Sequence, residues 1–171
     1  MDSYMEYMVT KRVDIKGYAL RFLIVALALA LMLVVFFVPA LNMFSPFFII
    51  GIGYGAWYLI TSLYLEYEYI VTNDDLDVDK IIAKKKRKRM LSVNVKQIEK
   101  IAPVSPDNQS EFSHASIKHT VNAAAQLNQE TTYYVLFEDQ GKGKSVLFLD
   151  APDEMIAMLK KYIPTKVTLR G

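Results

Sequence analysis

The chain has 171 residues, of which 53% are apolar and 22% charged, and its formal net charge is +2 at pH 7. This length allows one ordinary domain, or one small domain with a membrane anchor. The chain contains no cysteine, which excludes disulfide bonds and thiolate metal sites. Because many charged residues coexist with so apolar a composition, the two kinds must be segregated along the chain.

Two apolar stretches near the N-terminus are each long enough to cross a lipid bilayer. Residues 18–38 contain a single charge, Arg21, and residues 44–65 contain none. A helix spans the hydrocarbon core with about 20 residues. Val38-Pro39-Ala40 fits the cleavage pattern of a signal peptide, but the apolar stretch before it is longer than the roughly 7–15 residues of such a signal. Residues 17–65 are therefore predicted to form a hairpin of two transmembrane helices.

Basic residues mark the end of the hairpin that is expected to face the cytoplasm. Lys11, Arg12 and Lys16 precede the first apolar stretch, a basic run follows the second, and the connection 39–43 is uncharged. Cytoplasmic segments of membrane proteins carry an excess of lysine and arginine, so both termini are predicted to be cytoplasmic. The chain is thus expected to be a multi-pass protein of the cell membrane.

Small residues predict how the two helices pack. Ala26 and Ala30 in the first stretch, like Gly51 and Gly55 in the second, have the four-residue spacing that lets helix backbones approach closely. In an antiparallel hairpin the first pair lies at the depth of the second, so Ala30 is predicted to face Gly51 and Ala26 to face Gly55. The alternative is that the two glycines form a contact between two copies of the chain.

The N-terminal residues 1–16 are predicted to be a separate cytoplasmic segment. Met1, Tyr4, Met5 and Met8 have a spacing that would align them along one side of a helix. This pattern favours a short amphipathic helix at the membrane interface. The alternative is a terminus without fixed structure, because so short a helix is marginally stable on its own.

Residues 66–171 are predicted to form a cytoplasmic domain of antiparallel strands closed by a C-terminal helix. Alternating patterns indicate strands at 66–71, 76–81, 90–101 (a third strand and the start of a fourth), 131–138 and 145–150. Residues 152–163 begin with proline, carry acidic residues in the first turn and lysines in the last, and so indicate a helix. Residues 105–116 read as a polar loop, and residues 117–130 are compatible with a short helix.

Six consecutive cations lie at a connection between two of the predicted strands: Lys84, Lys85, Lys86, Arg87, Lys88 and Arg89. They are candidates for contact with anionic lipid, because each cation near such a surface contributes roughly 1 kcal/mol. The alternative is a solvated turn whose charges balance the aspartates of the adjacent strand. The aromatic or glycine-rich partners typical of nucleic-acid binding are missing beside the run, so nucleic acid is not an expected partner.

The sequence offers weak candidates for catalysis, and each has a simpler interpretation. Gly143-Lys144-Ser145 matches the end of a phosphate-binding loop, but it joins two strands and lacks the leading glycine. His114 and His119 are five residues apart, without an acidic partner at ligand spacing. The aspartates at 75, 77 and 79 alternate along a strand, which predicts one solvated face rather than a cation site. We therefore expect no catalytic residue, metal or cofactor.

The order of these elements resembles that of a known family. A membrane hairpin leads into a tyrosine-led strand with a Thr/Asn/Asp turn, a second strand, a basic connection, and a strand that ends in a polar-x-Ile-acidic-x-Ile segment. In this chain they are residues 69–74, 76–82, 84–89 and 97–101. They are similar to the bacterial pleckstrin-homology-like (PH-like) domains of small membrane proteins, and the whole chain resembles a Gram-positive family with two helices. The resemblance implies a PH-like antiparallel sheet or barrel. The glycine that usually precedes the basic connection is replaced by Ile82-Ala83.

Two functions fit these expectations. The first is a membrane-anchored, non-enzymatic adaptor or scaffold that presents a PH-like domain at the cytoplasmic membrane surface to a protein partner. An exposed strand edge or the polar segment 105–130 would carry that contact. The second is a sensor of anionic lipid or of the membrane surface that uses the basic run. A homo-oligomer is compatible with both, and PH-like architecture alone does not choose between them.

Overall fold

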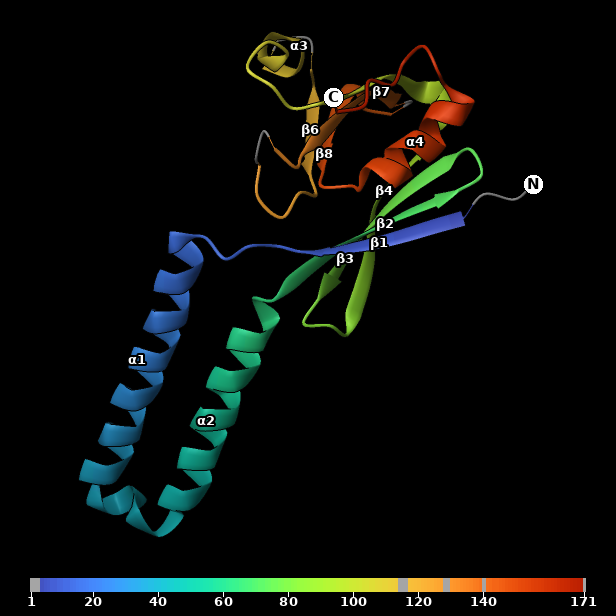
Figure 1. Ribbon diagram of the computed structural model, residues 1–171. Coiled ribbons are helices and arrows are strands. Elements are labelled where there is room, and N and C mark those ends of the chain that lie inside the picture. Colours follow the sequence, from blue (N-terminus) through green and yellow to red (C-terminus); the bar gives the residue numbers. More distant parts are fainter. Residues whose placement is uncertain (1–3, 114–116, 128–129, 140, 171) are drawn as a thin grey trace. The chain divides into compact units, whose positions relative to one another are not determined.

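The computed structural model describes residues 4–113, 117–127, 130–139 and 141–170, and the chain divides into two compact units (Figure 1). A helical unit contains residues 12–65 and the turn 82–84. A β unit contains the other described residues. The predicted α+β class is confirmed, with two long apolar helices, two sheets and a C-terminal helix.

The helical unit consists of two antiparallel helices, α1 (Ile15–Phe37) and α2 (Ser45–Ser62), joined by the 3-10 segment η1 (Pro39–Phe44) (Figure 1). Asp14 caps α1, because its carboxylate accepts a hydrogen bond from the Gly17 N–H at 2.8 Å. Mean hydropathy reaches 2.8 in the first helix and 1.5 in the second. By length and composition, both helices are able to cross a membrane.

The two helices meet along a seam that differs from the predicted one. Gly53 faces α1, since a Cβ added there would lie 3.7 Å from Met32 Cε. The residues predicted to line the seam lie outside it: Ala26, Ala30, Gly51 and Gly55. A Cβ added to either of these glycines meets no atom within 4 Å, and both alanines are exposed. Matching depths did not fix the rotation of each helix about its axis, and a shift of two residues turns a helical face by about 200°.

Four strands form the first sheet of the β unit, in the order β1-β2-β3-β4. They are β1 (Tyr4–Thr10), β2 (Leu65–Thr72), β3 (Asp75–Ile82) and β4 (Lys86–Asn94). β1 pairs antiparallel with β2, so that Tyr7 lies opposite Tyr69 and Met8 opposite Glu68. Tyr69 belongs to the main core, and Glu68 therefore points to the other face, which we call the outer face of the sheet.

The N-terminal segment is thus a strand, and the expectation of an amphipathic helix over residues 1–16 is wrong for its described part. Met5 and Val9 pack against the main core, and the even-numbered residues of β1 face outward with Glu68. β2 offers a complete edge for backbone pairing, whereas an isolated helix of this length is marginal in water. Tertiary pairing therefore overrides the helical spacing of the apolar residues.

Four further strands form the second sheet, in the order β5-β7-β8-β6. They are β5 (Ile98–Pro103), β6 (His119–Asn122), β7 (Tyr133–Asp139) and β8 (Gly143–Leu149). β6 runs parallel to β8, and β7 is antiparallel to both of its neighbours. The 3-10 turn η2 (Val95–Gln97) leads from β4 into β5, and a short helix, α3 (Gln109–Ser113), precedes β6. The segment 117–130 contributes a strand instead of the helix considered from its sequence.

The main core is built from both sheets and from the C-terminal helix α4 (Asp153–Tyr162). Its largest fully buried side chains include Tyr69, Leu76, Ile98, Ile101, Phe137, Leu147, Met155, Ile156 and Leu159. α4 agrees with the predicted helix 152–163, with acidic residues in its first turn and lysines in its last. Met155, Ile156 and Leu159 of this helix close the core.

Phe112, Ile117 and Ala124 of the polar segment 105–130 pack on the other face of the second sheet. Phe112 of α3 contacts Tyr134 and Phe148, with ring centroids 5.0 and 5.3 Å apart. The Tyr134 hydroxyl donates to Glu111 at 2.9 Å, and burial together with this bond raises the pKa of Tyr134. Part of a segment that looked like an exposed contact surface therefore serves the fold itself.

Candidate functional site

The helical hairpin is inserted between two strands that pair with each other. β1 ends at Thr10, the chain runs through α1 and α2, and β2 begins at Leu65. β1 and β2 pair along seven residues, from Tyr4 opposite Thr72 to Thr10 opposite Glu66. Both ends of the hairpin are therefore joined by the chain to the same sheet.

The basic run begins in the tight turn between β3 and β4, next to the end of α2. The Ala83 N–H donates to the Tyr64 carbonyl at 2.9 Å, and Lys84 Nζ lies 5.0 Å from the centre of the Tyr64 ring. Ala83 and Lys84 have φ values of 55° and 56°, in the left-handed region that favours glycine. The turn attaches the start of the basic run to the end of the helical hairpin.

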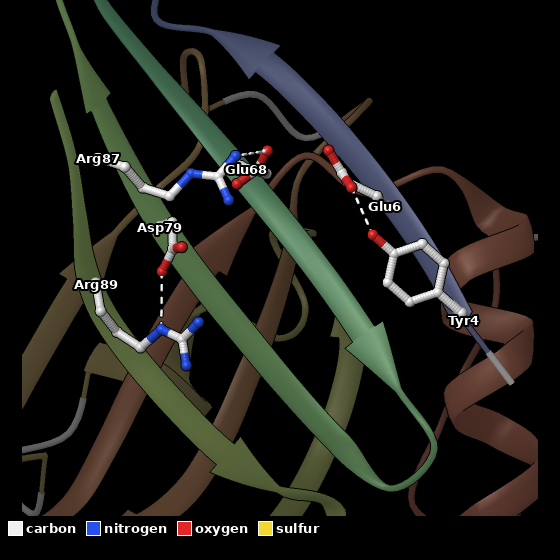
Figure 2. A network of polar contacts seen from close by, with 6 residues as sticks. All are labelled: Tyr4, Glu6, Glu68, Asp79, Arg87 and Arg89. Carbon is white, nitrogen blue, oxygen red and sulfur yellow. Dashed lines mark hydrogen bonds and ion pairs between the residues drawn. The ribbon is translucent and has the colours of Figure 1, made fainter. Parts of the chain in front are cut away.

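The two arginines of the run form ion pairs on the outer face of the first sheet (Figure 2). Arg87 Nη2 lies 2.7 Å from Glu68 Oε1. Arg89 contacts Asp79 through Nε and Asp77 through Nη1, both at 2.9 Å. Glu68 is fully buried and Asp79 is 3% exposed, so each carboxylate depends on its cation. Of the three aspartates of β3 that were expected to form a solvated face, Asp77 and Asp79 are instead paired with Arg89. Asp75 is exposed, as predicted, and accepts a hydrogen bond from Asn94.

The lysines of the run stand apart from these ion pairs. Lys86 and Lys88 alternate with the arginines along β4, are exposed, and contact no carboxylate among the described residues. Lys84 lies over the Tyr64 ring. The run therefore has two parts, arginines that hold neighbouring strands together and lysines that lie at the surface.

Tyr4 and Glu6 of β1 lie on the same outer face, next to these ion pairs (Figure 2). The Tyr4 hydroxyl donates to Glu6 at 2.6 Å. Glu6 lies diagonally across from Glu68 on the outer face, and the pKa of each carboxyl group depends on the other. The two groups can hydrogen-bond to each other only when one of them is protonated, because two ionised carboxylates have no donor. Burial, and then the bond to Glu6, raises the pKa of Glu68, whereas Tyr4 and Glu68 lower the pKa of Glu6. Of the two groups, Glu68 is therefore the one that takes up a proton more readily.

Little of this network could be predicted from the sequence. Because residues 1–16 were predicted to form a helix, Tyr4 and Glu6 were not expected to lie next to the sheet. Alternation along β2 did predict that Glu68 lies opposite the core face. What the sequence could not supply was the pairing of strands that brings Arg87 and Glu6 to either side of Glu68.

The weak candidates for catalysis that the structure describes lie in strands of the two sheets. Lys144 of the phosphate-loop-like stretch lies in β8 and pairs with Glu99 at 2.7 Å. His119 lies in β6, and His114 lies outside the described residues. Within the part of the chain that the structure describes, no three His, Cys, Asp or Glu side chains come together as a metal site.

A small hollow opens beside the C-terminal half of β4. It is lined by Ser92, Val93, Gln97, Phe137 and Asp139, and its volume is about 210 Å³. Pockets that hold small molecules are usually about 300–1,000 Å³ and mostly enclosed. This hollow is too small and too open to define a ligand site.

Two sheets and a closing C-terminal helix, with an apolar helical hairpin inserted after the first strand, match the α+β architecture of a PH-like domain. The family model of the bacterial PH-like domain (DUF6106) matches residues 1–169, and the chain belongs to that family. The match covers the hairpin as well as both sheets, which confirms the resemblance seen in the sequence. No curated protein and no solved structure matches the chain. PH-like domains are in general not catalytic.

Proposed function

We propose that this protein is a membrane-anchored, non-enzymatic adaptor that presents its PH-like domain at the cytoplasmic membrane surface to a protein partner. The observation that carries the proposal is the pairing of β1 with β2 across the inserted hairpin. Because these strands flank the hairpin and belong to one sheet, a hairpin that enters a bilayer has to leave it on the same side. The hairpin is then the anchor and the β unit is the presented module.

The surface of the helices supports insertion into a membrane. A long apolar helix in the core of a soluble protein is mostly buried. Here only 6% of the most apolar 18-residue stretch of the first span, and none of that of the second, is buried. Apolar side chains exposed on all sides suit a lipid environment, where helices satisfy their own backbone hydrogen bonds. Lipid would cover the faces that the hairpin leaves open.

The distribution of cations supports the cytoplasmic side. Lys11, Arg12 and Lys16 lie just before or at the start of α1, and Lys84 lies at the end of α2. η1, at the opposite end of the hairpin, contains no charged residue. The positive-inside rule then directs the β unit to the cytoplasm.

A topology experiment tests the anchor. The chain has no cysteine, so single cysteines report single positions. Asn42→Cys in η1 and Ser92→Cys in β4 are treated with a membrane-impermeant maleimide, on intact and on permeabilised cells. We expect Asn42→Cys to react on intact cells and Ser92→Cys to react only after permeabilisation. Labelling of Ser92→Cys on intact cells would refute the cytoplasmic orientation.

A crosslinking experiment tests the adaptor role. A photo-activatable amino acid replaces exposed residues of the β unit one at a time, for example Ser92 or Leu127, in the full chain in living cells. An adaptor should give one discrete protein adduct that persists when Lys86 and Lys88 are changed to Gln. Absence of any protein adduct over the whole exposed surface would contradict the proposal.

Contact of the lysines with anionic lipid is a second candidate function. The observation that favours it is the attachment of the turn at Lys84 to Tyr64, at the end of α2. Since Arg87 and Arg89 are paired with carboxylates, the lysines alone would supply this attraction, at about 1 kcal/mol each before screening by salt.

Lysine acylation separates this candidate from the adaptor role. The full chain is placed in nanodiscs with or without anionic lipid, and the acetylation rates of Lys84, Lys86 and Lys88 are compared with that of Lys161 on α4. Lipid contact predicts about threefold slower acetylation of the run in anionic discs, reversed by about 0.5 M salt. Equal rates in both discs would exclude it.

A further inference from the structure

The edges of the two sheets differ in how they are protected. The outer edge of β5 is covered by the C-terminal segment, because Ile101 exchanges backbone hydrogen bonds of 2.8 and 2.9 Å with Lys166 and Thr168. β4 is an edge strand whose first four residues are cations. Cations along an edge repel a second edge of the same kind. Among the described residues, β1, the opposite edge of the first sheet, has neither protection.

Large apolar side chains are exposed on β1. Three of the five large apolar side chains exposed in the described part of the β unit lie on this strand: Tyr4 at 62%, Tyr7 at 40% and Met8 at 46%. Tyr4 and Met8 point to the outer face and Tyr7 to the core face, where it stacks on Tyr69 with centroids 6.4 Å apart. What these residues share is therefore the open edge, and a strand added there would cover side chains on both faces.

The sequence of β1 is suited to pair with itself. If two copies align antiparallel about Tyr7, Tyr7 lies opposite its equivalent, Glu6 lies opposite Met8, and Tyr4 lies opposite Thr10. No carboxylate then faces a carboxylate, and an aromatic pair stands at the centre. The same operation on β4 would bring two rows of cations together, so charge directs self-pairing to β1.

We propose that the partner of this edge is a second copy of the chain, whose β1 pairs antiparallel with β1 about Tyr7. The two four-stranded sheets then become one continuous sheet. In this dimer Tyr7 of each copy lies between Tyr69 of its own sheet and Tyr7 of the other copy. The contact goes beyond the adaptor role, and either can hold without the other.

Cysteine crosslinking tests the register. Tyr7→Cys in the full chain, oxidised in native membranes, should give a disulfide-linked dimer, because directly opposite residues of an antiparallel pair have Cβ atoms about 5 Å apart. Ser92→Cys, exposed on the β4 edge, is the matched control and should remain monomeric. If loss of Tyr7 weakens the dimer, chains with Tyr4→Cys and with Thr10→Cys, mixed, should still crosslink more than either alone.

Charge substitutions at position 8 test the contact without relying on crosslinking. Met8→Glu sets a carboxylate opposite Glu6 of the other copy, whereas Met8→Lys sets a cation there. Measured by sedimentation of the full chain in mild detergent, the first should weaken dimerisation about tenfold and the second should strengthen it. Opposite signs are not expected from a general loss of folding.

Two results would overturn the proposal. One is crosslinking of Tyr7→Cys, and of the mixed pair, no greater than that of Ser92→Cys. The other is a dimer that is insensitive to both substitutions at Met8 but crosslinks through Gly51→Cys, which would assign self-association to the open face of α2.

Discussion

β1 and β4 are the two edges of one sheet, and they differ in the chemistry that they expose. β4 starts with four exposed cations, of which Arg87 and Arg89 bind carboxylates of neighbouring strands. β1 has one charged residue, Glu6, and exposes two tyrosines and a methionine. The comparison teaches that the two arginines of the basic run, the most conspicuous feature of the sequence, serve the sheet itself. The open apolar edge lies instead in an N-terminal segment with no obvious motif.

The largest expected effect concerns the arginines of β4. Arg89→Ala leaves Asp79, which is 3% exposed, and its neighbour Asp77 without their cation. We expect a loss of about 2–4 kcal/mol in the free energy of unfolding, somewhat below the value for a fully buried pair because Arg89 is half-exposed. Denaturant unfolding of the full chain in mild detergent, followed by circular dichroism, measures it.

The matched control for this prediction is the next cation along the same strand. Lys88→Ala removes a charge that has no carboxylate partner among the described residues, and it should change stability by less than about 0.5 kcal/mol. Equal effects of the two substitutions would mean that the arginines and the lysines of the run do not have different roles.

The second prediction concerns the attachment of β1 and its dependence on pH. The pKa of Glu68 is raised above its ordinary 4.5, so the stability that a proton on Glu68 contributes is complete below that value. It is lost as pH rises through the pKa of Glu68 in the folded chain. The pKa of Glu6 is lowered, so its own contribution is lost only as pH falls through that lower value. Tyr4, Asp79 and Arg87 are the other groups that face this pair.

Hydrogen exchange of the β1 amides measures this attachment. Corrected for intrinsic rates, their protection should fall about three- to tenfold between about pH 4.5 and pH 7. Glu68→Gln cannot ionise but can still donate to Glu6, so its β1 protection should be nearly independent of pH. A variant that keeps the full pH dependence would show that Glu68 is not the group responsible.

The comparison of the two edges also shows what could be predicted from the sequence. Strands 131–138 and 145–150 and the helix 152–163 were recognised because strong local patterns coincide with their burial in the core. The role of β1 was missed because its residues satisfy helical and strand spacing equally, and only the free edge of β2 decides between them. The seam at Gly53 was missed because rotation about a helix axis is set by whole-helix packing, not by one small-residue motif.

A smaller effect is expected in the turn that precedes β4. Ala83 has a φ of 55°, and a side chain in that region costs about 1–2 kcal/mol relative to a right-handed conformation. Ala83→Gly relieves this strain but gives the unfolded chain more freedom. We expect a net gain of about 0.5–1 kcal/mol in denaturant unfolding. Ala102→Gly in the buried part of β5 is the contrast, and it should destabilise.

The variant with the smallest expected change in stability is also the most direct test of the difference between the two edges. Lys86→Thr with Lys88→Thr removes two exposed charges from β4 and adds residues that favour strands, so stability should change by less than about 0.5 kcal/mol. The neutralised edge, however, no longer repels another edge. We expect this variant to form higher assemblies in sedimentation, because each copy then offers two open edges, while Met8→Glu in the same chain limits them to pairs through β4. If the double variant assembles no further than the natural chain, the lysines do not act as edge protection, and lipid contact becomes the better explanation of their charge.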